Sequence, residues 1–242
     1  MSNPVLELDN VSFIASNGNT LIDKISLQLF KNDFLIVVGP NGSGKSSLFK
    51  LIGRTYKTTS GGIKLFGKQQ NHYTEQEYAN RIVVLSQSTE DHLCLSMTIA
   101  EHVKLYLMSN HRKMLSKSSM IEYLLSFNQK FERFYNLPVR SLSGGEKQTL
   151  ALALCLLREP DVLLLDEHTS ALDPKTGEMI MRMTYEKAKQ YGVTCLMSTH
   201  QLSQAINFGN RLVAIQSGSI YRVYNDIEKT DLTEESLYQA CY

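Results

Sequence analysis

The sequence lacks the long apolar segments of membrane-spanning and secreted chains. Its longest strictly apolar run covers residues 150–157, far fewer than the roughly 18–20 residues that cross a bilayer. Residues 1–5 contain neither the basic nor the apolar region of a secretory signal. We therefore expect any role at a membrane to require a separate membrane partner.

The sequence also has few cysteines and nearly equal numbers of basic and acidic residues. The four cysteines, Cys94, Cys155, Cys195 and Cys241, lie far apart and form no C-x-x-C pair, which predicts reduced, cytosolic and mostly buried thiols. The net charge of +1 gives no overall attraction to nucleic acid or acidic lipid. The 242 residues, 43% of them apolar, are enough for one large α/β domain or two small ones with a sizeable core.

A glycine-rich stretch is the strongest motif. It consists of Gly39, Pro40, Asn41, Gly42, Ser43, Gly44, Lys45, Ser46 and Ser47. It lies between an apolar strand-like run and a segment with helical spacing, the context of a phosphate-binding loop. Glycines let backbone N–H groups turn toward phosphate oxygens, and the helix start adds its dipole. We expect a nucleoside triphosphate here, with Lys45 at the β- and γ-phosphates and Ser46 on Mg²⁺. The alternative is a glycine-rich turn that binds nothing.

Apolar patterns predict the remaining elements. Strands are predicted at 6–13, 25–30, 63–66, 81–85, 162–165 and 193–197, and a hairpin at 211–216 and 219–223. Helices are predicted at 74–79, 98–108, 118–127, from 143 onward, 174–191, 201–208 and 233–242. This order predicts an α/β fold, a phosphate-loop NTPase core with an N-terminal antiparallel β subdomain. A small helical subdomain is inserted at approximately 88–140 of a single domain spanning 1–242.

Further motifs occur in a fixed order after the phosphate loop. Residues 142–146, Leu-Ser-Gly-Gly-Glu, resemble the signature motif of ATP-binding-cassette (ABC) ATPases. The apolar run that ends in Asp166 and Glu167 matches the Walker B strand, and residues 170–173 resemble the D-loop. Gln87 is similar to the Q-loop glutamine and His200 to the switch histidine. The resemblance covers essentially the whole chain and implies binding of ATP.

The acidic pair has a chemistry of its own. A carboxylate at the C-terminal end of a buried strand, such as Asp166, can hold Mg²⁺ through water. The resemblance implies that Glu167 is the general base toward water, that Gln87 contacts water or Mg²⁺, and that His200 contacts the γ-phosphate. Two alternatives stay open: the carboxylates cap the next turn, and Gln87 is an ordinary loop residue.

The signature segment repeats the features of an anion-binding helix N-terminus, with Ser143, Gly144 and Gly145 at its start. In the family this segment contacts the ATP of a second subunit, so that two nucleotides lie between two domains arranged head to tail. The resemblance also places Asp173 of the D-loop among the nucleotide-binding residues. The structural alternative is a helix-capping box of Ser143 and Glu146, and both interpretations can hold at once.

Three features depart from the family pattern. Ala15 lies where an aromatic residue usually stacks on adenine, and Phe13 substitutes only if it is not a core residue. Thr149 and Leu154 occupy places where many members carry arginine. His168 replaces the usual loop proline, which we interpret as a packing change rather than a catalytic one.

The segments 166–169, 173–176 and 207–212 resemble a subgroup of bacterial uptake-system ATPases. Permeases of that subgroup are similar to branched-chain amino-acid permeases, and some members are linked to aromatic amino acids. The resemblance implies an ATP-hydrolysing importer subunit, peripheral at the cytoplasmic face of the inner membrane. Its expected partners are a second copy of the chain, integral membrane permease subunits and an extracytoplasmic solute-binding protein, and not nucleic acid. The alternatives are the ATPase of an exporter and a soluble ABC ATPase of the DNA-repair or ribosome-associated type.

Overall fold

The N-terminal part forms a four-stranded antiparallel sheet in the order β2-β1-β4-β5. The computed structural model describes residues 3–109 and 116–241. The strands of this sheet are β1 (Leu6–Ile14), β2 (Thr20–Leu29), β4 (Ser60–Leu65) and β5 (Lys68–Gln69). Leu6, Leu8 and Val11 of β1 face the core, and Leu6 is paired to Leu29 on one side and to Leu65 on the other. The predicted antiparallel β subdomain is confirmed.

A second sheet of six strands has the order β10-β9-β3-β8-β7-β6. Its strands are β3 (Phe34–Val38), β6 (Ile82–Leu85), β7 (Val162–Asp166), β8 (Thr194–Ser198), β9 (Arg211–Gln216) and β10 (Ser219–Tyr224). All neighbours from β9 to β6 are parallel, and β10 forms an antiparallel edge. The carboxyl ends of β3, β6, β7 and β8 therefore lie at one edge of the sheet, where ligands of such folds bind.

Both faces of the parallel sheet are covered. Leu35 and Val37 of β3 pack in a core shared with α1 (Lys45–Ile52) and the antiparallel sheet. Phe34, Ile36 and Val38 face the opposite core, which includes residues of α6 (Gly144–Leu157) and α7 (Pro174–Tyr191). Burial on both faces explains the continuous apolar run of this strand.

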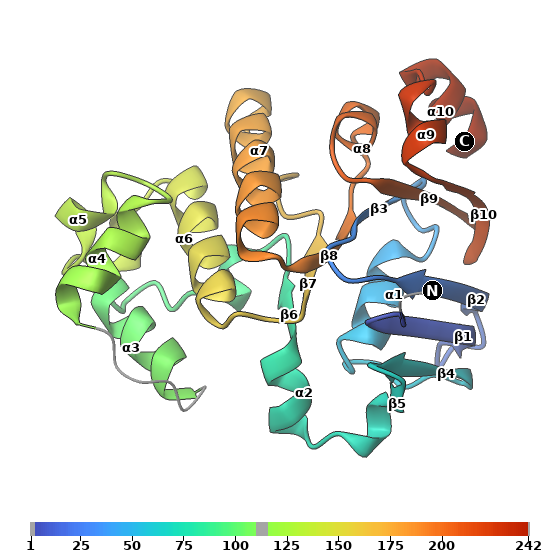
Figure 1. The fold of residues 1–242 in the computed structure, drawn as a ribbon, viewed down its shortest axis with the longest axis horizontal. Coiled ribbons are helices and arrows are strands. Elements are labelled where there is room, and N and C mark those ends of the chain that lie inside the picture. The colour runs from blue at the N-terminus through green and yellow to red at the C-terminus, as the bar shows by residue number, and fades with distance from the viewer. Residues whose placement is uncertain (1–2, 110–115, 242) are drawn as a thin grey trace.

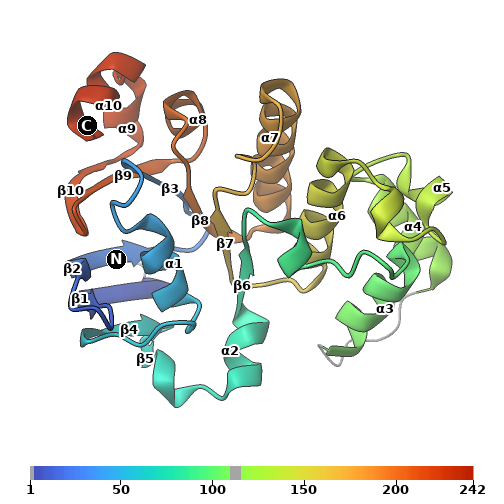
Figure 2. The same ribbon diagram turned by 180° about the vertical axis from the view of Figure 1, so that it is seen from behind.

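The region predicted as a helical insertion contains α3 (Ile99–Ser109), α4 (Lys117–Leu125) and α5 (Phe131–Phe134). These helices lie at one end of the molecule and the antiparallel sheet at the other, with α6 and α7 between them (Figures 1 and 2). Backbone hydrogen bonds close the region, from Val139 N–H to Met97 O and from Arg140 N–H to Leu95 O, both 2.9 Å. The bounds 88–140 stay a prediction.

Four further α-helices are α2 (Glu75–Arg81), α8 (Leu202–Asn207), α9 (Asp226–Thr230) and α10 (Glu234–Cys241). The sequence did not predict β5, α5 or α9, because segments of two to five residues show no clear periodicity. Strand β2 begins at Thr20 and not at the predicted residue 25, since irregularities in its pairing with β1 interrupt the alternation. The predicted end of the terminal helix, Tyr242, lies outside the described residues.

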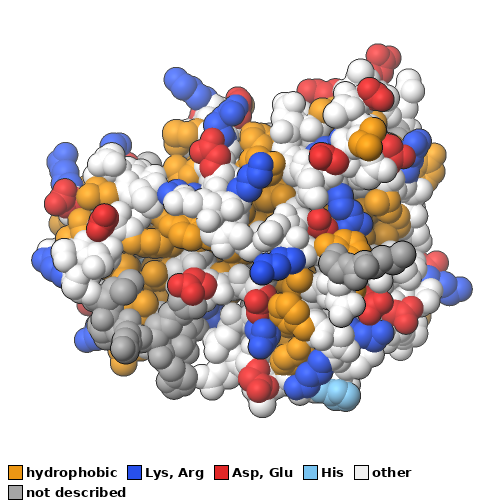
Figure 3. All heavy atoms as spheres, viewed as in Figure 1, with side chains coloured by type: hydrophobic (Ala, Val, Ile, Leu, Met, Phe, Trp, Pro, Cys, Tyr) orange, Lys and Arg blue, Asp and Glu red, His pale blue; other side chains and the backbone are white. Residues whose placement is uncertain are grey.

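Three remaining observations concern the charges on the surface, the burial of the cysteines and the length of the helices. Basic and acidic side chains are interspersed over the face drawn in Figure 3. Cys155 and Cys195 are buried as predicted, Cys94 is exposed, and the side chain of Cys241 lies outside the description. Within residues 3–109 and 116–241, every helix is too short or too polar to cross a membrane.

Candidate nucleotide-binding and catalytic site

The phosphate loop connects β3 to α1 and leaves no room for side chains at two of its glycines. A Cβ atom at Gly39 would lie 2.1 Å from the carbonyl oxygen of Ile215, and one at Gly44 would lie 2.6 Å from that of Leu21. Gly44 also has a φ of 104°, in the left-handed region that glycine tolerates. It caps α1 without a side-chain hydrogen bond, so the first N–H groups of this helix remain available to an anion.

A cavity of about 400 Å³ opens beside this loop. Its lining comes from the phosphate loop, the ends of β6 and β7, and β2: Leu21, Asn41, Gly42, Gly44, Lys45, Ser46, Ser47, Gln87, Asp166 and Glu167. The parallel sheet thus gathers at one edge residues that the sequence carries far apart. Gly39, Pro40 and Ser43 belong to the loop but do not line the cavity.

Two side chains of the phosphate loop, Lys45 and Ser43, have surroundings that bear on phosphate binding. Lys45 is 4% exposed, and its Nζ donates hydrogen bonds to Gly39 O at 2.8 Å and Pro40 O at 3.1 Å. The same Nζ lies 3.7 Å from Glu167 Oε1. The buried Ser43 Oγ has no hydrogen-bond partner among the described residues. A buried hydroxyl without a partner inside such a loop fits a phosphate oxygen.

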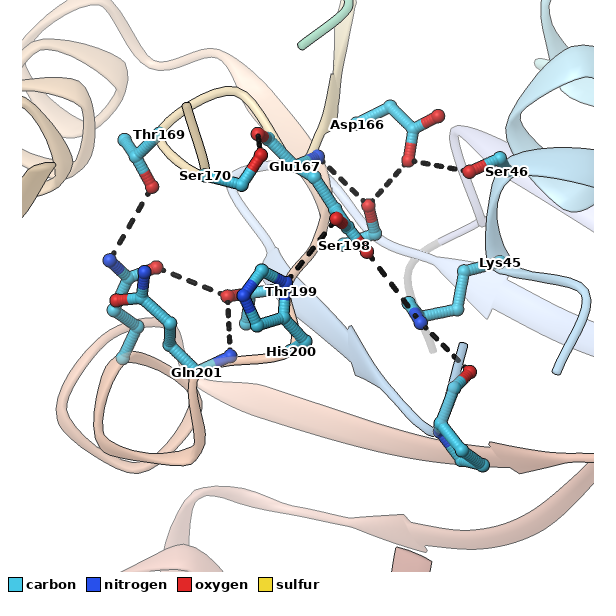
Figure 4. Close-up of polar contacts among 12 residues, drawn as sticks. Lys45, Ser46, Asp166, Glu167, Thr169, Ser170, Ser198, Thr199, His200 and Gln201 are labelled. Carbon is cyan, nitrogen blue, oxygen red and sulfur yellow. Dashed lines mark hydrogen bonds and ion pairs between the residues drawn. The ribbon is translucent and has the colours of Figure 1, made fainter. Parts of the chain in front are cut away.

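Asp166 is the last residue of β7, Glu167 follows it, and both face the loop (Figure 4). Asp166 Oδ1 accepts hydrogen bonds from Ser46 Oγ at 3.3 Å and from Ser198 Oγ at 2.6 Å. Glu167 Oε2 lies 3.3 Å from His200 Nδ1. The backbone of Glu167 has a φ of 47°, a left-handed conformation that costs a non-glycine residue about 1–3 kcal/mol and is often found at functional sites.

The oxygen donors of the cavity fit a magnesium ion. The Ser46 hydroxyl, the Asp166 carboxylate and the Gln87 amide all line it. Mg²⁺ prefers hard oxygen ligands and is usually bound by one or two carboxylates together with phosphates and water. In the described part of the chain, no three His, Cys, Asp or Glu side chains are grouped to hold a metal. The arrangement therefore suits an ion shared with phosphate groups rather than one held by protein alone.

The signature segment lies apart from this cavity within the chain. Ser143 caps α6: its Oγ accepts from Glu146 N–H at 3.3 Å, and Glu146 Oε2 accepts from Ser143 N–H at 2.8 Å. A hydrogen bond from Lys130 lowers the pKa of Glu146. A Cβ at Gly145 would lie 2.6 Å from the Thr176 methyl group of α7, so a larger residue there requires Thr176 to shift. Neither these residues nor Gly144 line the cavity of their own chain.

Asp173 of the predicted D-loop is the N-cap of α7. Its carboxylate accepts a hydrogen bond from Thr176 N–H at 3.1 Å, and hydrogen bonds from Thr176 lower its pKa. Asp173 does not line the cavity either. The structure of one chain thus brings together the phosphate loop, Gln87, the acidic pair and His200, but not the signature segment or Asp173.

The structure shows the surroundings of three residues that concern the departures from the family pattern, Phe13, Ala15 and His168. Phe13 is half-buried and stacks on Tyr56, with ring centroids 4.8 Å apart and planes at 22°. Neither Phe13 nor Ala15 lines the cavity; the apolar side chain that does is Leu21. His168 is buried beside Thr184 Oγ1, 3.1 Å from its Nε2, and burial lowers its pKa to about 4. This environment agrees with a packing role for His168.

Sequence reasoning missed two residues of the site, Leu21 and Ser198. Leu21 falls in the part of β2 that the alternation did not predict, so no signal indicated it. Ser198 directly precedes Thr199 and His200 at the end of a buried parallel strand. A polar residue at that place was the available signal, because the carboxyl ends of such strands meet at the ligand-binding edge.

The phosphate loop lies at the carboxyl edge of a parallel sheet and faces acidic residues at the end of β7, which is separated from β3 by β8. This arrangement defines a P-loop nucleoside triphosphatase. A sequence model of the family described as "ABC transporter" matches residues 22–170. The chain belongs to the ABC transporter family and is an ATP-binding ATPase of that family.

Similar proteins align over nearly the whole chain. It is 33% identical to a tyrosine transport ATP-binding protein of Clostridioides difficile (strain R20291), covering 97% of this chain and 98% of that one. It is 31% identical to a methionine import ATP-binding protein of Oenococcus oeni (strain ATCC BAA-331 / PSU-1), covering 99% of this chain and 72% of the relative.

Solved structures share the fold. A dimeric ATP-binding cassette in a post-hydrolysis state, bound to ADP and Pi, superposes with a TM-score of 0.77 at 28% identity, covering 91% of this chain and 98% of that one. The cbiO1 protein of Clostridium perfringens, part of the transporter complex cbiONQ, gives a TM-score of 0.82 at 23% identity, covering 98% and 94% of the two chains. The second likeness concerns the fold alone.

Proposed function

We propose that this chain is the ATP-hydrolysing subunit of a bacterial importer and that the imported solute is an aromatic amino acid such as tyrosine. The observation that carries the proposal is the end-to-end similarity to a tyrosine transport ATP-binding protein, with 97% of one chain and 98% of the other aligned. The alignment therefore extends over nearly the whole length of both chains. A methionine import protein among the relatives supports amino acids as the solute class.

Within the site, we assign roles from the geometry. The loop residues 39–47 bind the phosphates, and Lys45 supplies positive charge to them. Ser46, Asp166 and Gln87 hold Mg²⁺, which neutralises phosphate charge when bound. Glu167 accepts the proton of the attacking water, and His200, whose Nδ1 lies 3.3 Å from the Glu167 carboxylate, orients that carboxylate and contacts the terminal phosphate.

The signature segment and Asp173 act on the nucleotide of a second copy of the chain. Their separation from the cavity of their own chain supports this assignment, and a related cassette is described as dimeric. In this arrangement two nucleotides lie between two chains placed head to tail. ATP closes the dimer, and hydrolysis reopens it.

The remaining partners follow from the transport role. Permease subunits in the inner membrane receive the motion through Gln87 and the helical subdomain at approximately 88–140. The chain is then peripheral at the cytoplasmic face, and an extracytoplasmic protein delivers the solute. Nucleic acid is not among the expected partners.

Co-purification followed by reconstitution tests the proposal. The tagged chain is isolated from its native membranes, the proteins bound to it are identified, and the complex is placed in vesicles with ATP on the side of the ATPase. We expect permease subunits to be present and labelled tyrosine to move toward that side. Movement in the opposite direction identifies an exporter. ATP hydrolysis without any membrane protein favours the soluble class. Transport of methionine but not tyrosine contradicts the assigned solute.

A further inference from the structure

Ser198 lies beside the acidic pair at the edge of the parallel sheet. In the register of β7 and β8, Asp166 is paired with Ser198, and both are the last residues of their strands. Paired residues of neighbouring parallel strands present their side chains on the same face. Ser198 is fully buried, at 0% exposure, so its hydroxyl requires protein partners.

The hydroxyl of Ser198 contacts both acidic residues at once (Figure 4). It donates a hydrogen bond to Asp166 Oδ1 at 2.6 Å and accepts one from the Glu167 backbone N–H at 3.0 Å. The short distance to Asp166 is typical of a hydroxyl donating to a charged carboxylate. The bond from Glu167 N–H holds the residue whose φ of 47° lies in the left-handed region.

We infer that Ser198 is a positioning residue that fixes the Asp166 carboxylate and the backbone of Glu167 in one arrangement. This inference rests on the roles proposed above for Asp166 and Glu167. Ser198 occupies Oδ1 and leaves Oδ2 of Asp166 without a hydrogen bond from the described residues. Ser46 also donates to Oδ1, but at 3.3 Å, and it is itself a proposed metal ligand. Of the two hydroxyls, Ser198 therefore makes the shorter hydrogen bond to Asp166 and has no proposed role as a metal ligand.

A buried hydroxyl can also serve strand packing alone, and the same strand offers such a case. Thr194 is the first residue of β8 and is 1% exposed. Its Oγ1 accepts a hydrogen bond from Asn32 N–H at 3.1 Å, and it does not line the nucleotide cavity. Loss of the Thr194 hydroxyl removes the acceptor of a backbone N–H, as loss of the Ser198 hydroxyl does, but at the opposite end of β8. Thr194→Val is therefore a matched structural control.

The test compares Ser198→Ala, Ser198→Thr and Thr194→Val in the full chain. Three quantities are measured: kcat and KM for ATP, binding of a non-hydrolysable ATP analogue with and without Mg²⁺ by calorimetry, and unfolding in urea. For Ser198→Ala we expect kcat to fall by roughly 10–100-fold, the effect of losing a hydrogen bond to a charged group. Analogue affinity without Mg²⁺ stays unchanged, but the gain in affinity caused by Mg²⁺ becomes smaller. Ser198→Thr, which retains the hydroxyl, restores both quantities.

The control separates positioning from stability. Thr194→Val is expected to lower the stability of the fold about as much as Ser198→Ala while its kcat and its Mg²⁺ effect stay within about twofold of wild type. A folded Ser198→Ala chain with wild-type kcat and a wild-type Mg²⁺ effect overturns the inference. Equal kinetic losses in Thr194→Val overturn it as well.

Two further variants, Ser198→Cys and Glu167→Gln, keep the test decisive if Ser198→Ala does not fold. Cysteine is close in size to serine but is a weak donor, so Ser198→Cys is expected to behave kinetically like the alanine variant, and wild-type behaviour contradicts the inference. Glu167→Gln is measured in parallel. If that variant hydrolyses ATP at the wild-type rate, the proposed role of Glu167 fails. The Mg²⁺ effect of whichever Ser198 variant folds, alanine or cysteine, then still decides whether Ser198 positions Asp166.

Discussion

Replacing Glu167 by glutamine removes a negative charge and a proton acceptor but keeps the size of the side chain. In the structure the carboxylate is 20% exposed and lies 3.7 Å from Lys45 Nζ and 3.3 Å from His200 Nδ1. Lys45 loses one ionic partner but retains its two backbone carbonyl acceptors. We therefore expect the change to cost about 1–2 kcal/mol in the free energy of unfolding, between the values of exposed and buried ion pairs.

The expected effect on catalysis is larger. Loss of a general base typically lowers the rate by about 10²–10⁴-fold, which corresponds to roughly 3–5 kcal/mol in the activation barrier. Binding of ATP depends on the loop and Mg²⁺ ligands, which the substitution leaves in place. Glu167→Gln should therefore retain ATP binding, lose most turnover and accumulate as an ATP-bound dimer.

Steady-state ATPase assays, calorimetry with ATP and size exclusion in the presence of ATP measure these three properties. Glu178→Gln is the control, because it removes a carboxylate from an exposed pair with Arg182 at 3.5 Å on α7. Its rate should stay within about twofold of wild type. A Glu167→Gln chain that binds ATP and hydrolyses it at a near-normal rate refutes the assignment and places the base elsewhere.

Three further results are expected. Wild type should discriminate poorly between ATP and GTP, because Ala15 offers no ring to the base; Ala15→Tyr should tighten ATP binding by up to about tenfold, and an unchanged affinity in titrations contradicts this. In a chain lacking the exposed Cys94, Ser143→Cys and Asn41→Cys should crosslink between chains when ATP is present, and crosslinks formed only within a chain contradict the trans contact. Burial lowers the pKa of Lys229 to about 8, below its ordinary 10.5. The folded chain therefore binds fewer protons than the unfolded chain between these values, and its stability should rise with pH relative to Lys229→Met. The last expectation is contradicted if the free energies of unfolding of the two proteins, measured in urea, change equally with pH across this range.

Local signals made much of the fold predictable. Helix α7 has the predicted bounds because its ends are encoded in the sequence: Asp173 caps it, Pro174 occupies its first position, and Gly192 ends it in the left-handed conformation. The phosphate loop was predictable for the same reason, since its glycines and the flanking strand and helix are contiguous. The short elements β5, α5 and α9 were not, because two to five residues are too few to show a period.

The candidate site was predictable only where a motif marked it. Asp166 and Glu167 follow a buried run, so their place at the edge of the sheet could be inferred. The contact of Ser198 with both residues depends on the register of β7 and β8, which no single segment contains. Leu21 reaches the cavity because β2 passes beside Gly44, and sequence alone does not give that crossing.

The geometry of Ser143 shows how one residue can cap a helix and still contact an anion. Its Oγ accepts the N–H of Glu146, which uses a lone pair and not the hydroxyl hydrogen. Among the described residues this hydroxyl donates to no acceptor, and Ser143 is exposed. The capping box therefore fixes the position of the oxygen at the start of α6 and leaves its hydrogen available for the proposed contact with a phosphate of a second chain. Helix capping and the proposed trans contact are two uses of the same hydroxyl. The Ser143→Cys crosslink replaces that hydroxyl and therefore tests how close position 143 lies to the second chain.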